Sequence, residues 1–149
     1  AKNNTIRLVK LKQSHDYNAL FKGLKNATWE KALKHAMQQN LKSVIAFHND
    51  KPIGFAGPLY IKENGLGYFA GIGVLNEYQG MGIGKLLFNY LCIALKNEGA
   101  TYMTLFTGTE NKANHMYQKE GFKLVTQFNN FQKEGFKLVT QFNNFQKKI

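Results

Sequence analysis

The chain has 149 residues, of which 44% are hydrophobic and 13% aromatic, a composition typical of a globular protein and not of a disordered or fibrous one. Its length predicts a single domain over residues 1–149, and no stretch approaches the length of a membrane span. The lone cysteine, Cys92, excludes an internal disulfide, and residues 1–4 lack the apolar core of a signal peptide. We therefore expect a cytoplasmic protein.

The formal net charge of +11 raises the question of nucleic-acid binding. The lysines are scattered along the chain, however, and Arg7 is the only arginine, whereas base recognition relies heavily on arginine. We therefore do not expect nucleic acid as the partner. A positive surface would also speed the capture of a polyanionic small molecule.

The spacing of apolar residues predicts the secondary structure. In chain order we expect a strand at 5–11, helices at 14–26 (capped by Ser14) and 29–39, strands at 42–47, 53–61 and 66–75, a helix at 83–98, a strand at 101–106 and a short helix at 111–120. This order predicts an α/β fold. The helix at 83–98 is expected to bury one continuous stripe and to end at Gly99; the stripe comprises Ile83, Leu86, Leu87, Tyr90, Leu91, Ala94 and Leu95.

Three alternate glycines, Gly80, Gly82 and Gly84, lie where the strand at 66–75 gives way to this long helix. Glycines leave backbone N–H groups uncovered, and a helix N-terminus carries partial positive charge. The turn can therefore hold a phosphate or pyrophosphate with main-chain atoms alone. The residues expected to do so are Gln79, Gly80, Met81, Gly82, Ile83, Gly84 and Lys85.

Two common nucleotide-binding signatures fail on spacing. A Walker A loop would need glycine at position 79 and serine or threonine at position 86, where the chain has Gln79 and Leu86. A dinucleotide fingerprint started from Gly71, Gly80 or Gly82 does not end on glycine. The neighbourhood of the loop also shows no ligand cluster for a metal, so we expect a phosphorylated cofactor bound without one.

The run Gln79-Gly80-Met81-Gly82-Ile83-Gly84 resembles the acyl-CoA loop of the GNAT superfamily of N-acyltransferases, whose pattern is Arg/Gln-x-x-Gly-x-Gly/Ala. The resemblance implies a three-layer fold with a central, mixed and splayed sheet flanked by helices and completed by a C-terminal β-hairpin. It also implies that the main chain of Ile72, Gly73 and Val74 binds the pantetheine arm and polarises the thioester carbonyl. The cosubstrate would be acetyl-CoA, with no metal.

A second motif, Asn111 to Phe122, is similar to the family's Asn-containing segment with its Tyr-x-x-x-Gly-Phe ending. Tyr117 stands at the family's tyrosine and is expected to act as the general acid that protonates the leaving thiolate. The family asparagine lies seven residues before the tyrosine, where this chain has Glu110, so the cofactor contact falls to Asn111 or Asn114. The general base is open among Glu63, Glu77, Glu110, His48 and His115.

Residues 118–131 recur without change as residues 132–145. Two copies are too few for a solenoid. The resemblance suggests that copy one supplies the penultimate strand and copy two the last strand, with a turn at residues 133–135. The alternatives are a loosely held extra copy, or strand exchange between chains in a homodimer.

The leading hypothesis is an N-acetyltransferase that transfers the acetyl group of acetyl-CoA to a primary amine of a small molecule or protein by direct attack in a ternary complex. A non-catalytic CoA-binding or regulatory module, or a basic nucleic-acid-binding protein, are the alternatives. The identity of the acceptor lies beyond the sequence.

Overall fold

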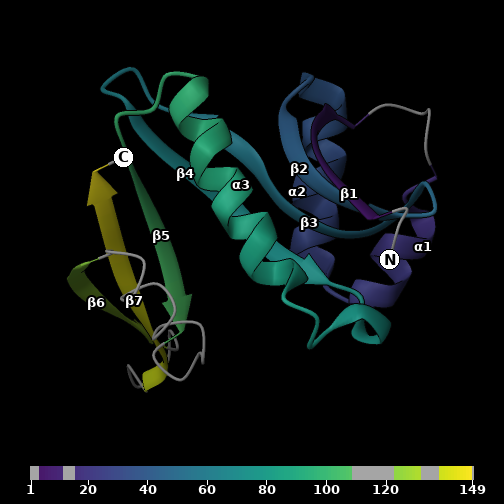
Figure 1. Cartoon of the computed structure of the whole chain (residues 1–149). Helices are drawn as coiled ribbons and strands as arrows, with labels where there is room; N and C mark the ends of the chain where they lie inside the picture. The colour runs from purple at the N-terminus through teal and green to yellow at the C-terminus, as the bar shows by residue number, and fades with distance from the viewer. Residues whose placement is uncertain (1–3, 12–15, 109–122, 132–137, 149) are drawn as a thin grey trace.

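The computed structural model describes residues 4–11, 16–108, 123–131 and 138–148 (Figure 1). The strands in this part of the chain form one sheet in the order β1-β2-β3-β4-β5-β7-β6. Only β4 and β5 are parallel neighbours, so the sheet is mixed. The strands are β1 (Asn4–Lys10), β2 (Lys42–His48), β3 (Lys51–Ile61), β4 (Leu66–Val74), β5 (Tyr102–Gly108), β6 (Lys123–Phe131) and β7 (Leu138–Lys148).

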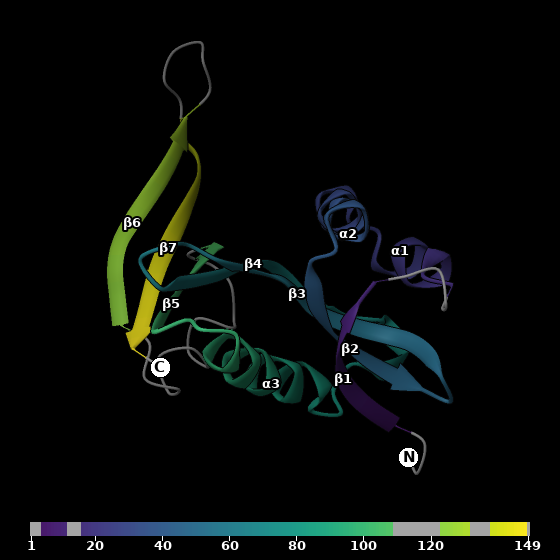
Figure 2. The same cartoon turned by 90° about the horizontal axis from the view of Figure 1, so that it is seen from above.

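Helices cover both faces of the sheet, as expected for a three-layer fold. Figure 2 shows α1 (Asn18–Leu24) and α2 (Ala27–Gln39) on one face and α3 (Ile83–Asn97) on the other. The Asn26 side chain accepts a hydrogen bond from the Trp29 N–H at 3.0 Å, which fixes the start of α2. A short 3-10 turn, η1 (Asn76–Tyr78), joins β4 to the glycine loop.

Each face of the sheet carries its own apolar core. On the α1–α2 side, Leu20, Leu33 and Phe55 are fully buried. On the α3 side, Leu87, Phe88 and the β5 residue Met103 are buried among apolar neighbours. On this face α3 packs against residues of both β4 and β5.

The buried stripe of α3 differs from the prediction. Leu86 is 55% exposed and Tyr90 37% exposed, whereas Phe88, which the predicted stripe omitted, is 1% exposed. The helix is therefore rotated toward the Leu87–Phe88–Leu91 side, because Phe88 packs edge-on against Phe69 of β4. The rest of the predicted stripe, from Ile83 to Leu95, is buried as expected.

The first helix starts later than predicted. It begins at Asn18 and not at Ser14, because the Asp16 carboxylate accepts a hydrogen bond from the Asn18 N–H at 2.9 Å and residues 16 and 17 are not helical. The other predicted elements among the described residues lie within two residues of their expected ends. The helix expected at 111–120 and the turn expected at 133–135 lie outside the described residues.

Strand β4 has two unlike flanks. On the β3 side the antiparallel register runs from Gly54↔Val74 to Ile61↔Gly67. On the β5 side only Leu66↔Tyr102 and Gly67↔Met103 are paired. The two strands then diverge, which confirms the predicted splay of the sheet.

The duplicated segments occupy adjacent strands. Strand β6 belongs to copy one and β7 to copy two, and β7 lies between β5 and β6 with antiparallel register on both sides. The expected C-terminal hairpin is therefore confirmed at the level of the backbone. No helix of the described residues is long and apolar enough to cross a membrane.

Candidate acetyl-CoA site

A cavity of about 520 Å³ lies between the turn that joins α1 to α2, the end of β4 and the glycine loop. Three groups of residues line it: Gly23, Leu24, Lys25 and Trp29 from the helical side; Ile72, Gly73 and Val74 from β4; and Asn76, Tyr78, Gln79, Gly80, Gly82, Ile83 and Gly84 from the loop and the start of α3. The strand and loop residues predicted from the sequence thus meet at one cavity. Of the predicted loop residues, Met81 and Lys85 do not line it, and their side chains are exposed.

The glycine loop presents unused backbone donors at the start of α3. The first hydrogen bond of the helix runs from the Leu86 N–H to the Gly82 carbonyl at 3.2 Å, and no side chain caps the helix at Gly82. The amides of residues 80–85 therefore have no hydrogen-bond partner among the described residues. Together with the positive end of the helix dipole, they form a site for an anion.

Backbone conformation explains two of the three glycines. Gly80 has φ +81° and Gly82 has φ +78°, a left-handed region that costs other residues about 1–2 kcal/mol. A Cβ added at Gly80, Gly82 or Gly84 would meet no atom of the described residues within 4 Å. The space over the loop is therefore open, and a bulky diphosphate can approach the main chain there.

Gln79 braces the loop from inside. Its side-chain Nε2 donates to the Val74 carbonyl and to Asn76 Oδ1, both at 3.1 Å, and its backbone N–H donates to the Asn76 carbonyl at 3.2 Å. Residue 79 therefore differs from the prediction of uncovered amides at residues 79–85, because the donors of Gln79 are used within the protein. The set of uncovered amides therefore begins at Gly80.

The outward edge of β4 also carries backbone N–H groups that have no partner among the described residues. Main-chain groups of successive strand residues point alternately to the two sides. The Leu75 N–H donates to the Ile53 carbonyl of β3 at 2.9 Å, so Gly73 also faces β3 while Ile72 and Val74 face away from it. The side they face is the one from which β5 has diverged. Their N–H groups therefore face the space between the splayed strands.

The Trp29 indole packs on one face of β4, over Gly71 and Gly73. A Cβ added at Gly71 would lie 2.3 Å from the indole Nε1, and one added at Gly73 would lie 2.6 Å from Cζ3. The indole also meets Phe55 edge-on, with ring centroids 5.4 Å apart. These glycines are thus needed for close packing of Trp29 on β4, and the tryptophan forms one wall of the cavity.

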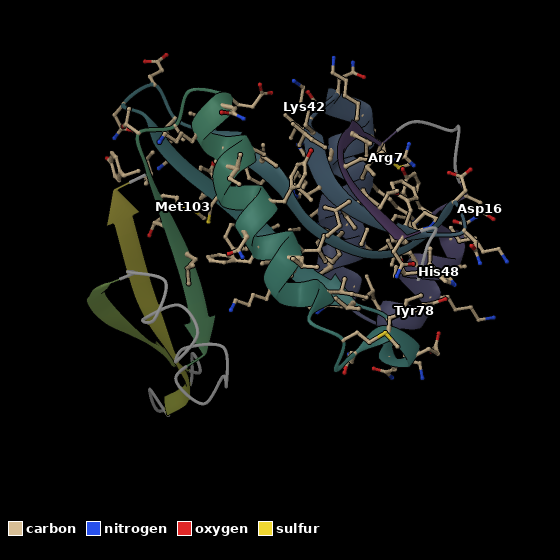
Figure 3. All side chains as sticks on the ribbon, viewed as in Figure 1. Arg7, Asp16, Lys42, His48, Tyr78 and Met103 are labelled. Atoms are coloured by element: carbon tan, nitrogen blue, oxygen red, sulfur yellow. The ribbon has the colours of Figure 1, made fainter. Side chains whose placement is uncertain are left out.

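The nominees for the general base are dispersed. Glu63 is exposed in the turn between β3 and β4, and Glu77 is exposed in η1. The His48 ring contacts the side chains of Asn4 and Asn49 and packs beside Tyr78, with ring centroids 5.4 Å apart (Figure 3). None of these three lines the cavity. The remaining candidates, together with Asn111, Asn114 and Tyr117, lie outside the described residues.

Among the described residues, two tyrosines have a raised pKa, and neither lines the cavity. Burial raises the pKa of Tyr17, an effect that the nearby Arg7 partly offsets. Burial, and to a lesser extent the stacked Tyr68, raises the pKa of Tyr60. Within the described residues, no group of three or more His, Cys, Asp or Glu side chains could hold a metal ion.

The helical wall of the cavity includes two residues, Leu24 and Lys25, that no sequence motif singled out. Leu24 and Lys25 line it because Lys25 adopts a left-handed conformation, with φ 53°, at the end of α1. Gly23 allows α1 to approach closely, since a Cβ there would lie 2.4 Å from Leu75 Cδ2. Only the Lys25-Asn26 step, a helix end followed by a capping residue, could have indicated this turn in the sequence.

An anion cradle of backbone amides beside an unpaired strand edge is suited to a ligand that joins a diphosphate to an extended arm with amide groups. Coenzyme A has this form, so the fold and the site define an acyl-CoA-dependent transferase. The chain belongs to the acetyltransferase (GNAT) family, whose model matches residues 12–122. The match includes both motifs identified in the sequence.

Individual relatives agree with the family assignment. The chain is 33% identical over 119 residues to the [ribosomal protein bS18]-alanine N-acetyltransferase of Haemophilus influenzae, an alignment that covers 80% of this chain and 74% of the relative. Two crystal structures share the fold. A GNAT acetyltransferase from Elizabethkingia anophelis with acetyl-CoA bound has a TM-score of 0.73 at 20% identity, over 100% of both chains. The ribosomal-protein-S18-alanine N-acetyltransferase of Escherichia coli has a TM-score of 0.75 at 19% identity, over 97% of this chain and 94% of that one.

The protein is therefore an acetyl-CoA-dependent N-acetyltransferase with a GNAT fold. The enzyme hypothesis is confirmed over the alternative of a non-catalytic CoA-binding module. Its partners are acetyl-CoA and an amine acceptor.

Proposed function

We propose that the acceptor is the α-amino group of a protein that begins with alanine, with a ribosomal protein of the bS18 type as the substrate. The observation that carries this proposal is the 33% identity to the H. influenzae enzyme, which extends over 74% of that enzyme. The cavity is compatible with it, because its helical wall provides apolar surface from Leu24 and Trp29 beside the strand edge. A small first residue such as alanine would fit next to this wall.

In this proposal the main chain holds the cosubstrate. The amides of residues 80–85 bind the diphosphate, and Gln79 keeps the loop in place through its bonds to Val74 and Asn76. The outward N–H groups of Ile72 and Val74 orient the pantetheine arm and the thioester carbonyl. Gly73 contributes close packing against Trp29, since its own main-chain groups face β3.

Acetyl-CoA supplies the activated acyl group, and the neutral amine attacks it directly in a ternary complex. The C–N bond forms as the C–S bond breaks, the amine loses a proton, and the thiolate gains one. We assign the second proton to Tyr117, and a cofactor contact to Asn111 or Asn114, on the strength of the motif at 111–122. Replacing Tyr117 by Phe is expected to lower kcat about ten- to a thousandfold with little change in CoA affinity.

The test is a competition between peptides. One peptide carries a free N-terminal alanine and an internal lysine, a second has the same sequence with its α-amine blocked, and a third begins with leucine. Acetylation is located by mass spectrometry and its rate followed by the release of CoA thiol. We expect the alanine α-amine to be preferred over the lysine side chain and over leucine by at least about tenfold in kcat/KM. Equal modification of the blocked peptide would refute the proposal.

We also propose that the reaction takes place in the cytoplasm. The single cysteine of the chain supports this location, as does the ribosomal-protein substrate named for the H. influenzae relative.

A further inference from the structure

The outermost strand of the sheet on its C-terminal side is β6. Figure 2 shows β6 at the margin of the molecule, with β7 beside it. Among the described strands β6 pairs only with β7, so one of its edges has no strand partner there. An unpaired strand edge presents a row of backbone donors and acceptors to other chains.

Strands β6 and β7 have the same sequence from Leu124 to Phe131 and from Leu138 to Phe145, and their register is symmetric. Phe128 lies opposite Phe142, its own equivalent in the second copy. Outward from this pair, Gln127 lies opposite Asn143 and Asn129 opposite Gln141. The two copies of the segment therefore pair with each other in antiparallel orientation, with Phe128 and Phe142 at the centre of the symmetric register.

This symmetry determines which residues the free edge presents. Main-chain groups alternate along a strand, so the residues of β7 that do not face β6 face β5. Because the register is symmetric about Phe128↔Phe142, the residues of β6 that face outward between Thr126 and Asn130 are the equivalents of those that β7 turns away from β6. Part of this edge duplicates one that already forms an antiparallel ladder: of the β7 residues paired with β5, Phe142 to Phe145 have their equivalents in β6, at Phe128 to Phe131.

Apart from Lys123 at its first position, the sequence of β6 contains nothing that discourages pairing at this edge. Sheet edges in soluble proteins are commonly blunted by charged residues or proline. The opposite edge strand, β1, carries Arg7 and Lys10, and its Arg7 lies near Asp50. Between Leu124 and Phe131, β6 has neither a charge nor a proline.

We propose that two copies of this chain associate through β6, edge to edge and antiparallel, so that the two sheets become continuous across a two-fold axis. Antiparallel pairing of one segment with itself is isologous, and it closes at two chains because each chain uses its single β6 edge. Pairing β6 with β1 of another copy would instead form open chains. That arrangement brings Lys123 and the basic β1 together between molecules that each carry a net charge of +11.

The charge of the chain sets the conditions under which the dimer forms. Two molecules of net charge +11 repel each other at low ionic strength, and salt screens this repulsion. We therefore expect the dimer to be stronger at high salt than at low salt. An association driven by contact between opposite charges would show the reverse dependence.

The test is sedimentation equilibrium of the full chain over a range of concentrations, at low and moderate salt. We expect a reversible monomer–dimer equilibrium with a Kd of about 1–100 μM at moderate salt, as for a small interface. The double variant Gln127→Lys, Asn129→Lys in copy one places like charges at the edge of both chains. It is expected to weaken dimerisation at least about tenfold while leaving thermal stability and acetyl transfer unchanged.

The repeat provides a matched control. The same two changes in copy two, Gln141→Lys and Asn143→Lys, fall in β7, an interior strand, and are expected to lower Tm. Hydrogen exchange of the unmodified chain gives a readout that needs no variant: β6 amides should gain protection as protein concentration rises. A chain that stays monomeric above about 100 μM, assemblies that grow beyond two copies, or an edge variant that dimerises like the unmodified chain would each overturn the proposal.

Discussion

The two flanks of β4 are built for different tasks. Toward β3 the strand is paired along its length, and the glycines at 71 and 73 let Trp29 pack against it. Toward β5 it is paired at two positions only and then leaves its outward main-chain groups without strand partners among the described residues. Stability is thus concentrated on one side of the strand, and the capacity to bind a ligand on the other.

The difference shows how one strand can serve both purposes. A backbone group used in a ladder cannot also bind a cosubstrate, whereas a strand with no ladder would not be held in place. Pairing on a single flank solves both problems. We call the side of β4 that pairs with β3 the closed flank, and the side from which β5 diverges the open flank. Changes on the closed flank should therefore affect folding, and changes at the open flank and the glycine loop should affect binding.

The largest effect is expected from breaking the closed flank. Gly71→Val places a side chain where even a Cβ would come within 2.3 Å of the Trp29 indole. We expect a loss of about 3 kcal/mol in the free energy of unfolding, measured by urea denaturation. The control is Gly84→Ala, where the added methyl meets no atom within 4 Å. A double-mutant cycle with the smaller change Gly71→Ala tests the cause. If the Trp29 indole is the obstacle, Gly71→Ala should cost less stability in a Trp29→Ala background than in the unmodified chain. Strictly additive losses of stability would contradict this explanation.

A smaller but more selective effect is expected at the loop. Gly82→Ala forces an L-residue into φ +78° at the N-terminus of α3. The strain costs about 1–2 kcal/mol, and relaxation of the loop should weaken acetyl-CoA binding about tenfold by calorimetry. Gly99→Ala is a matched control, because φ there is +110° and the position lies beyond the other end of α3. It should lower stability and leave binding intact, whereas equal binding losses in both variants would point to a general effect of destabilisation.

The brace between loop and strand should have a moderate kinetic effect. Gln79→Ala removes the hydrogen bonds to the Val74 carbonyl and Asn76 Oδ1. With about 1 kcal/mol lost in loop positioning, we expect KM for acetyl-CoA to rise about fivefold while kcat changes less than about twofold. Glu77→Ala, a neighbouring exposed position, serves as the control. A large fall in kcat with unchanged KM would instead indicate a role for Gln79 in the chemical step.

The smallest effect is expected on the pH dependence of stability, at a contact between β3 and β4 on the closed flank. Tyr60 of β3 stacks on Tyr68 of β4, and burial raises the pKa of Tyr60 above its ordinary value of 10.0. A phenol with a raised pKa in the folded state contributes stability that is present below pH 10 and is lost as pH rises through the folded-state pKa. Tyr60→Phe should therefore reduce the fall in Tm above this pH and leave its profile near neutrality unchanged. An equally steep alkaline fall in the variant would assign the effect to other groups.

Much of the fold and the loop side of the site could be predicted from the sequence. Glycines 80, 82 and 84 stand out because alternate glycines before an amphipathic helix have few other uses. The elements before and after them follow from apolar spacing. The repeat could be placed in the last two strands because the GNAT resemblance implies a C-terminal hairpin and the ten-residue core from Phe122 to Phe131, which recurs, has strand character.

What could not be predicted depends on contacts between distant segments. Phe88 is buried and Leu86 exposed because α3 is rotated toward Phe69, and periodicity alone cannot define that rotation to one residue. Leu24 and Lys25 join the site because of how α1 docks on Leu75. The role of Gln79 is a local exception: its donors are satisfied by Val74 at the end of β4 and by Asn76 of η1, and the motif carries no signal for these bonds. The assignments of Tyr117, Asn111 and Asn114, and of the chain as a single domain, stay predictions.

Because β4 and β5 pair at one end only, the sheet consists of two parts that are joined at that end. One part comprises β1 to β4 and the other β5, β7 and β6, while α3 packs against both. A ligand seated where β4 and β5 diverge would occupy backbone N–H groups of β4 that have no strand partner among the described residues. Its binding should therefore slow amide exchange at Ile72 and Val74.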